Sequence, residues 1–150
     1  MRERKPKCPI LDAMRDACAD EARAVEFLEA RRWGDSPRCP RDGCRSTAVK
    51  RMKDRTTGGR ERHYRWRCKS CNRMFSVRTG TTFEESRLKL KVWVYAIWRA
   101  SSSKKGCSAL ELSRQMEITH KSALFVLRRI RHGMGVVTAP PLNGTLEADV

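Results

Sequence analysis

The sequence predicts an α+β fold, in which a small three-stranded sheet is preceded by one helix and followed by a helical module. Three observations support this. Two cysteine pairs enclose a stretch where aromatic and basic residues alternate, and apolar residues recur at helical spacing on either side of it. Only 39% of the 150 residues are hydrophobic, which favours small modules over one large core.

The two ends of the chain are predicted to contain little regular structure. Residues 1–19 are expected to be a disordered leader, because their first seven residues are basic and poor in apolar side chains, with prolines beside them. Residues 136–150 are expected to be a linker, marked by Pro140 and Pro141, and residues 145–150 would begin a further strand.

Residues 20–83 are predicted to form one helix and the sheet. Asp20 is a good N-cap, and helical spacing of apolar residues continues to Arg32. Between the cysteine pairs, residues 63–68 alternate with a period of two, which places aromatic side chains on one face of a strand and basic side chains on the other. Residues 74–78 form another short β-like run. Three short strands and two cysteine turns are therefore expected.

The paired cysteines point to a metal site. Cys39 and Cys44 are separated by four residues and Cys68 and Cys71 by two, and the 23 residues between the pairs are enough for a β-hairpin. Zn²⁺ prefers a tetrahedron of thiolates, which two such turns supply. These four residues are the predicted ligands of one structural Zn²⁺ in a zinc ribbon, and a closed four-thiolate site leaves no position for a catalytic water.

Two other interpretations of the cysteines stay open at this point: a redox Cys-x-x-Cys site, and a metal site in which His63 is the fourth ligand. The remaining cysteines have no Cys or His neighbour at ligand spacing, so they are expected to be free thiols in a reducing compartment. They are Cys8, Cys18 and Cys107.

The net charge of +16 and pI near 10.3 indicate a polyanionic partner, and double-stranded DNA is the first candidate. Residues 38–91 hold 17 Lys and Arg against 5 Asp and Glu, an excess of +12, so the cysteine-bearing segment is the basic one. Arg62, Arg65 and Arg67 are predicted phosphate contacts, with a merely solvated charged face as the alternative. No apolar run is long enough to cross a membrane and no signal-like core follows the N-terminus, which predicts a cytoplasmic protein.

Residues 84–135 are predicted to form a helix-turn-helix. Residues 108–111 read as a capping box, and Thr119 is an N-cap for a second helix. The inward stripe of that helix is expected to contain Ala123, Val126, Leu127, Ile130 and Met134. Its outward face is expected to carry His120, Lys121, Ser122, Phe125, Arg128 and Arg129.

On that outward face, Lys121 and Ser122 are the predicted base contacts, because first-turn residues of a recognition helix usually reach base edges. His120 beside them is a further predicted DNA-binding residue. Arg128 and Arg129 are the predicted phosphate contacts. A helical hairpin with a charged face and no ligand is the alternative.

Several motifs resemble the N-terminal zinc-ribbon and helix-turn-helix region of bacterial insertion-sequence transposases of the Asp-Asp-Glu, ribonuclease-H-like type. They are Tyr-Arg-Trp-Arg-Cys-Lys-Ser-Cys at residues 64–71, Met-Phe-Ser-Val-Arg-Thr-Gly-Thr-Thr-Phe at residues 74–83, Ser-Ala-Leu-Glu-Leu at residues 108–112 and Arg-Arg-Ile-Arg at residues 128–131. The similarity covers about residues 20–135. It implies the DNA-binding portion of a transposase, which recognises terminal repeats during DNA transposition.

The same resemblance places Asp149 at the position of the first catalytic carboxylate, and Val150 stands where the family usually has a glutamate. A two-metal phosphoryl-transfer site needs several carboxylates on a rigid scaffold, which one terminal aspartate cannot supply. The chain is therefore expected to be a truncated, non-catalytic piece that binds DNA and associates with copies of itself or with full-length transposase. The alternatives are a protein-interaction module of a transposition complex, an orphan DNA-binding protein resembling a transcription factor, and an active nuclease in a longer reading frame.

Overall fold

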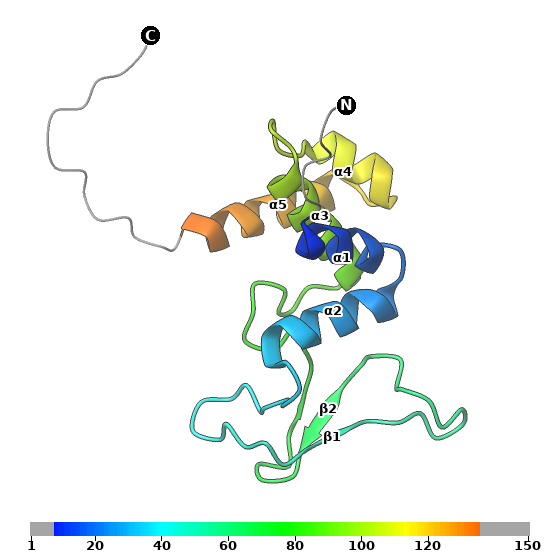
Figure 1. Cartoon of the computed structure of the whole chain (residues 1–150), viewed down its shortest axis with the longest axis vertical. Coiled ribbons are helices and arrows are strands. Elements are labelled where there is room, and N and C mark those ends of the chain that lie inside the picture. Colours follow the sequence, from blue (N-terminus) through cyan, green and yellow to red (C-terminus); the bar gives the residue numbers. More distant parts are fainter. Residues whose placement is uncertain (1–7, 136–150) are drawn as a thin grey trace, which may run out of the picture.

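The computed structural model describes residues 8–135, and this part contains five helices and one three-stranded sheet. The predicted α+β class is confirmed. Four helices lie at one end of the long axis, the sheet lies at the other, and α2 lies between them (Figure 1). The elements are α1 Pro9–Ala17, α2 Glu21–Trp33, β1 Val49–Arg51, β2 Trp66–Cys68, β3 Met74–Phe75, α3 Leu90–Ser102, α4 Ala109–Met116 and α5 His120–Gly135.

The predicted disordered leader is wrong for residues 9–17, which form α1. Pro9 occupies the first turn, where its missing N–H leaves no helical hydrogen bond unmade, so the proline starts a helix and does not prevent one. Met14 and Ala17 are buried in the core that α1 shares with α2 and α3. The sheet is consequently preceded by two helices, not one.

The three predicted strands are present and pair antiparallel in the order β1-β2-β3. Val49 lies opposite Cys68, and Trp66 lies opposite Phe75. Trp66 and Cys68 are buried while Arg67 between them is exposed, as the period of two predicts. The strand begins later than predicted, because Tyr64 has a left-handed backbone with φ 53° that interrupts the extended run.

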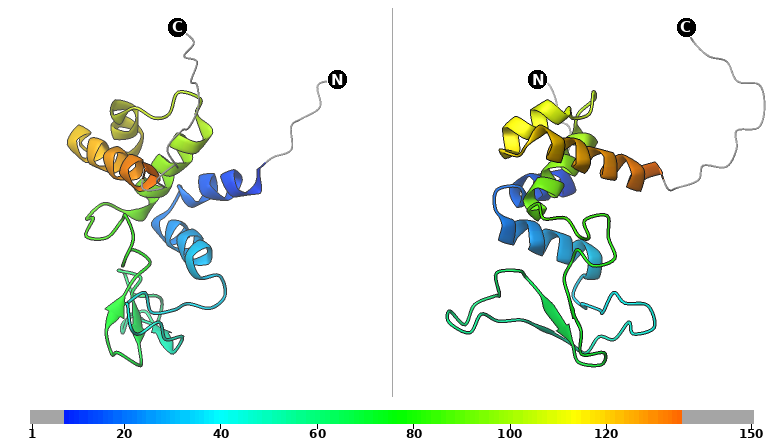
Figure 2. Two further views of the ribbon diagram at one scale, coloured as in Figure 1. Left: turned by 90° about the vertical axis from the view of Figure 1, so that its left-hand side faces the viewer. Right: turned by 180° about the vertical axis from the view of Figure 1, so that it is seen from behind.

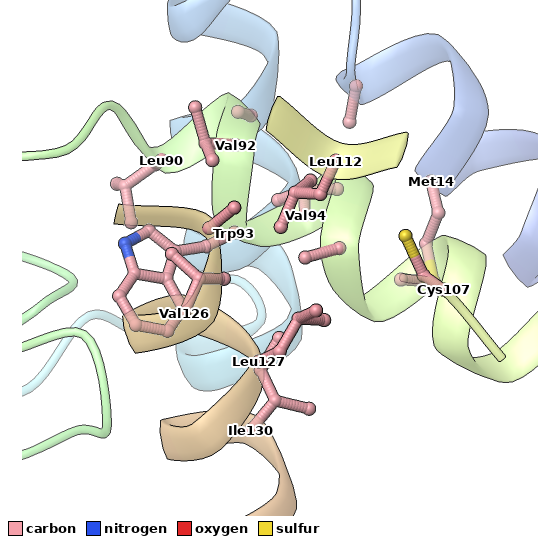
Figure 3. Close-up of a cluster of buried hydrophobic side chains, with 14 of the residues drawn as sticks. Met14, Leu90, Val92, Trp93, Val94, Cys107, Leu112, Val126, Leu127 and Ile130 are labelled. Carbon is pink, nitrogen blue, oxygen red and sulfur yellow. The ribbon is translucent and has the colours of Figure 1, made fainter. Parts of the chain in front are cut away.

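A helical core joins all five helices. It contains Met14 of α1, Trp93 and Val94 of α3, Leu112 of α4 and Val126 of α5 (Figure 3). The α5 stripe was predicted correctly through Ile130. Met134 is 69% exposed, because the last turn of α5 extends beyond the other helices (Figure 2).

The helix-turn-helix consists of α4, a tight turn and α5. Ser108 caps α4 by accepting a hydrogen bond from the Glu111 amide at 3.1 Å. Thr119 caps α5 in the same way, with the Ser122 amide at 3.2 Å. Glu117 makes the turn in a left-handed conformation, φ 52°. The capping box is therefore half-formed, since the Glu111 carboxylate pairs with Arg99 of α3 and does not return to its own cap.

Helix α2 connects the helical core to the sheet. Its Ala24 and Val25 are buried in the helical core, and its Glu29 accepts a hydrogen bond from the Trp66 indole of β2 at 2.7 Å. At the opposite end, Glu21 accepts the amides of Leu90 and its neighbour at 2.8 and 3.0 Å, and so caps α3 from another helix. These contacts fix the ribbon relative to the helices.

Within residues 8–135, no helix is both long enough and apolar enough to cross a membrane.

Candidate metal centre and nucleic-acid interface

The fold brings all four predicted ligands together. Cys39 and Cys44 lie in the loop after α2, Cys68 ends β2, and Cys71 lies in the turn that follows. Their sulfur atoms are within 4.8 Å of one another, with 3.8 Å between Cys39 and Cys71 and 3.7 Å between Cys44 and Cys68. A tetrahedron with metal–sulfur distances of about 2.3 Å has edges of about 3.8 Å. The cluster is thus positioned to bind one metal ion.

Backbone amides in the second cysteine turn stabilise the thiolate form of Cys68. The amides of Cys71 and Ser70 donate to the Cys68 sulfur and lower the pKa of its thiol to about 6. Burial acts in the opposite direction at Cys39, where it raises the pKa of the thiol to about 11. A buried thiolate is stable only when a cation compensates its charge, so the cluster suits a metal ion better than four free thiols.

The alternatives for the cysteines fit the geometry less well. A redox Cys-x-x-Cys site would use Cys68 and Cys71 alone, whereas the sulfur atoms of Cys39 and Cys44 lie within 4.8 Å of both. His63 is exposed and does not belong to the four-cysteine cluster, which is the one group of possible metal ligands that comes together in residues 8–135. Cys8, Cys18 and Cys107 are free and lie outside the cluster.

Three aromatic rings, those of Trp33, Trp66 and Phe75, pack against the four-cysteine cluster. Trp33, at the end of α2, meets Trp66 edge-on with 6.0 Å between ring centroids, and meets Phe75 edge-on at 5.8 Å. Together with the cysteines they form the small core of the ribbon. The alternation along the strand indicated Trp66, whereas only the packing identifies Glu29 and Arg60, which pair beneath it.

One basic surface lies on the outer face of the sheet. Lys50 is directly opposite Arg67, and both are exposed. They line a hollow, here called the ribbon groove, with Arg51, Lys53 and Lys69. Two cations facing each other across a strand pair repel, and this repulsion is relieved when an anion binds between them. Arg67, one of the predicted phosphate contacts, is therefore exposed on a basic face of the sheet.

Arg62 and Arg65 do not share that face. They line a second hollow, the junction groove, between the ribbon and the helices, where Arg87 and Lys89 lie on its helical side. Arg65 also forms an ion pair with Glu61. The basic side chains were expected on one face of a strand. Tyr64, the left-handed residue that shortens the strand, interrupts this arrangement.

The predicted DNA contacts of α5 share its outward side but differ in exposure and in their hydrogen bonds within the protein. His120, Lys121 and Arg128 are exposed. Ser122 is half-buried, and its hydroxyl is within 2.9 Å of the Thr119 hydroxyl at the cap. Arg129 is half-buried and donates to the Glu84 carbonyl at 2.9 Å. Arg129 is therefore anchored within the protein, whereas Arg128 is available to a ligand.

A continuous basic path joins the junction groove to α5. Arg87, in the segment before α3, lines the junction groove and also lines a hollow with Lys121 and Ser122 of α5. Sequence reasoning missed Arg87 and Lys89, although the alternation of basic and apolar residues at positions 87–91 could have indicated them. Asp149 and the predicted strand at residues 145–150 lie outside the described residues.

Comparison with known proteins supports the resemblance over the ribbon. Residues 19–74, which contain all four clustered cysteines, match the transposase zinc-ribbon domain family. An uncharacterized protein in transposable element ISH50 of Halobacterium salinarum is 30% identical over 131 residues, or 86% of this chain. The match spans 40% of the length of that relative. No solved structure matches the chain.

Proposed function

We propose that this chain is the DNA-recognition portion of an insertion-sequence transposase, with α4 and α5 reading the terminal repeats of the element and the ribbon contacting phosphates. The observation that carries the proposal is the continuous basic path from the ribbon to the outward face of α5. Basic side chains outnumber the carboxylates of Glu21 and Glu85 along this path. Such an excess over two modules suits a duplex backbone, which offers an anion every few ångströms along its length. The similarity of residues 19–74 to transposase zinc ribbons supports the same role.

In this proposal the four-cysteine cluster binds one structural Zn²⁺. The ion would supply cross-linking of the two cysteine turns, and four thiolates would leave it no open position for substrate. The ribbon core is small, so most of its folding free energy would come from metal binding. The role of this portion is recognition, with the chemistry of transposition belonging to other parts of a full-length enzyme.

Zinc content tests the metal part of the proposal. The purified chain is expected to contain about one zinc per protein, as a closed four-thiolate site requires. Replacing Cys68 and Cys71 together with serine removes the metal and unfolds the ribbon. The matched control replaces Cys8 and Cys18, which lie outside the cluster, and keeps the zinc. Full zinc content after the first double change would contradict the assignment.

Salt-dependent binding tests the DNA part. The chain is titrated with a labelled terminal-repeat duplex and with a scrambled duplex at several salt concentrations. Affinity for DNA falls as salt rises. Arg128→Ala is expected to make the negative slope of log affinity against log salt shallower by about one, the effect of one lost phosphate contact. Arg23→Ala, an exposed change on α2 away from both grooves, is the control.

Lys121→Ala reports on sequence recognition in the same titrations. Its loss is expected to reduce the preference for the repeat by about 1–3 kcal/mol, the usual contribution of one good base contact. Equal binding of the repeat and the scrambled duplex by the native chain at every salt concentration would refute specific recognition while leaving a general affinity for DNA.

A further inference from the structure

An aromatic ring interrupts the charged outward face of α5. Phe125 is 44% exposed, although it lies one helical turn after Lys121 and one turn before Arg128 and Arg129. Leaving a large apolar side chain in water costs free energy that a charged residue at this position would avoid. The ring is therefore an apolar group that this charged face offers to a ligand.

The protein holds this ring in a fixed place. Its centroid lies 6.2 Å from that of Trp93, a fully buried side chain of the helical core, in an edge-on arrangement. The Arg129 guanidinium lies over the ring, 5.1 Å from its centroid, and is itself anchored to the Glu84 carbonyl. Figure 3 shows the buried Trp93 against which the ring packs. The exposed part of Phe125 is thus presented without a further loss of side-chain entropy on binding.

Its surroundings identify the kind of ligand. Phe125 lines one hollow with Lys121, Leu124, Arg128, Arg129 and His132, and a neighbouring hollow with Glu85, Arg87 and Ser122. Across both hollows four Lys and Arg side chains stand against the one carboxylate of Glu85, which favours an anionic ligand with an apolar group at the position of the ring. In the major groove of DNA, phosphates flank base edges whose one apolar group is the C5-methyl of thymine.

We infer that Phe125 is a specificity-determining residue that packs against the C5-methyl group of a thymine in the major groove. The inference rests on the proposed function, because it requires α5 to lie in that groove. The sixth residue of α5 is still close enough to the helix N-terminus to reach a base edge, while Lys121 and Arg128 approach the neighbouring bases and phosphates.

Uracil substitution tests this contact, since deoxyuridine differs from thymidine only by the missing methyl group. A duplex is first selected by the full chain from a pool of randomised sequence. It is then resynthesised with deoxyuridine at one thymidine position at a time, and affinities are measured at fixed salt. At the contacted position we expect about fourfold weaker binding, which corresponds to about 0.8 kcal/mol for one methyl-sized group.

The variants assign the effect to the ring. Phe125→Ala is expected to bind the thymidine and deoxyuridine duplexes equally, whereas Phe125→Leu, which keeps an apolar contact, retains part of the difference. Ile10→Ala, a change at an apolar residue of α1 that is 45% exposed, leaves the difference between the two duplexes unchanged. Thermal denaturation of each variant checks that the helices remain folded.

Two results separate the inference from the proposed function. A selected duplex that tolerates deoxyuridine at every position, or an undiminished thymine preference in a folded Phe125→Ala chain, overturns the role of Phe125 alone. Failure to enrich any sequence overturns both, because an unspecific binder reads no base.

Discussion

Replacing Glu29 by glutamine should weaken the contact between α2 and the ribbon and so lower the stability of the protein. The Glu29 side chain is 7% exposed, and one of its carboxylate oxygens accepts hydrogen bonds from the Trp66 indole and from Arg60, which is 16% exposed. Glutamine keeps an acceptor for the indole but removes the charge. Arg60 is then left buried without a counterion, so the substitution isolates the ion pair from the shape of the side chain.

The expected loss in free energy of unfolding is about 3 kcal/mol, the lower end of the range for breaking a buried ion pair. The lower end applies because Arg60 keeps its contacts over the rings of Tyr64 and Trp66, at 5.2 and 5.7 Å from the centroids. The other oxygen of Glu29 and two nitrogens of Arg60 have no hydrogen-bond partner, so the pair is also incompletely satisfied at the outset.

Urea denaturation of the zinc-loaded chain, followed by tryptophan fluorescence, measures this loss because Trp33 and Trp66 lie at the junction. With a typical slope of about 2 kcal/mol per M, the midpoint should fall by about 1.5 M. Glu26→Gln, an exposed change on the same helix, is the matched control and should shift stability by less than about 0.5 kcal/mol. Equal midpoints for the Glu26 and Glu29 variants would show that the buried pair does not hold the junction.

Three other predictions concern local contacts. Ser108→Ala removes the side-chain cap of α4 and should lower the free energy of unfolding by about 1 kcal/mol in the same urea assay; no loss would mean that water replaces the cap. Hydrogen bonds from Arg65 lower the pKa of the Glu61 carboxyl, so their stabilisation is complete above the ordinary glutamate pKa and is lost as pH falls through the lowered value. An NMR titration of Glu61 should move upward in an Arg65→Gln chain, and an unchanged midpoint would contradict the pairing. Glu21→Gln weakens the cap of α3, so the Leu90 amide should exchange with solvent about fivefold faster, as expected for about 1 kcal/mol; an unaltered exchange rate would argue against it.

Part of the site follows from local sequence alone. The spacing of Cys39, Cys44, Cys68 and Cys71 predicts a shared metal site without knowledge of the fold, because cysteine turns supply their ligands from short segments. The cap residues Ser108 and Thr119 are equally local, since a cap bonds to an amide only a few residues away. The structure brings the four sulfur atoms within 4.8 Å of one another and forms both side-chain caps.

Other parts required contacts between distant residues. Pro9 begins a helix because α2 and α3 provide a surface for α1 to cover, which no property of the leader itself reveals. Glu21 caps α3 from 69 residues away, and Glu29 pairs with Arg60 across the junction. Such pairings depend on where elements pack, and many carboxylates in the sequence could have filled either role.

The basic residues show the same division. Composition determines that residues 38–91 carry an excess of +12, and hence that a polyanion is the expected partner. Only the tertiary structure decides that Arg67 faces the ribbon groove, that Arg65 faces the junction groove, and that Arg87 joins this groove to α5. The physical reason is that charge and ligand spacing are properties of the chain, whereas the direction of a side chain depends on backbone turns and on the neighbours against which its element packs.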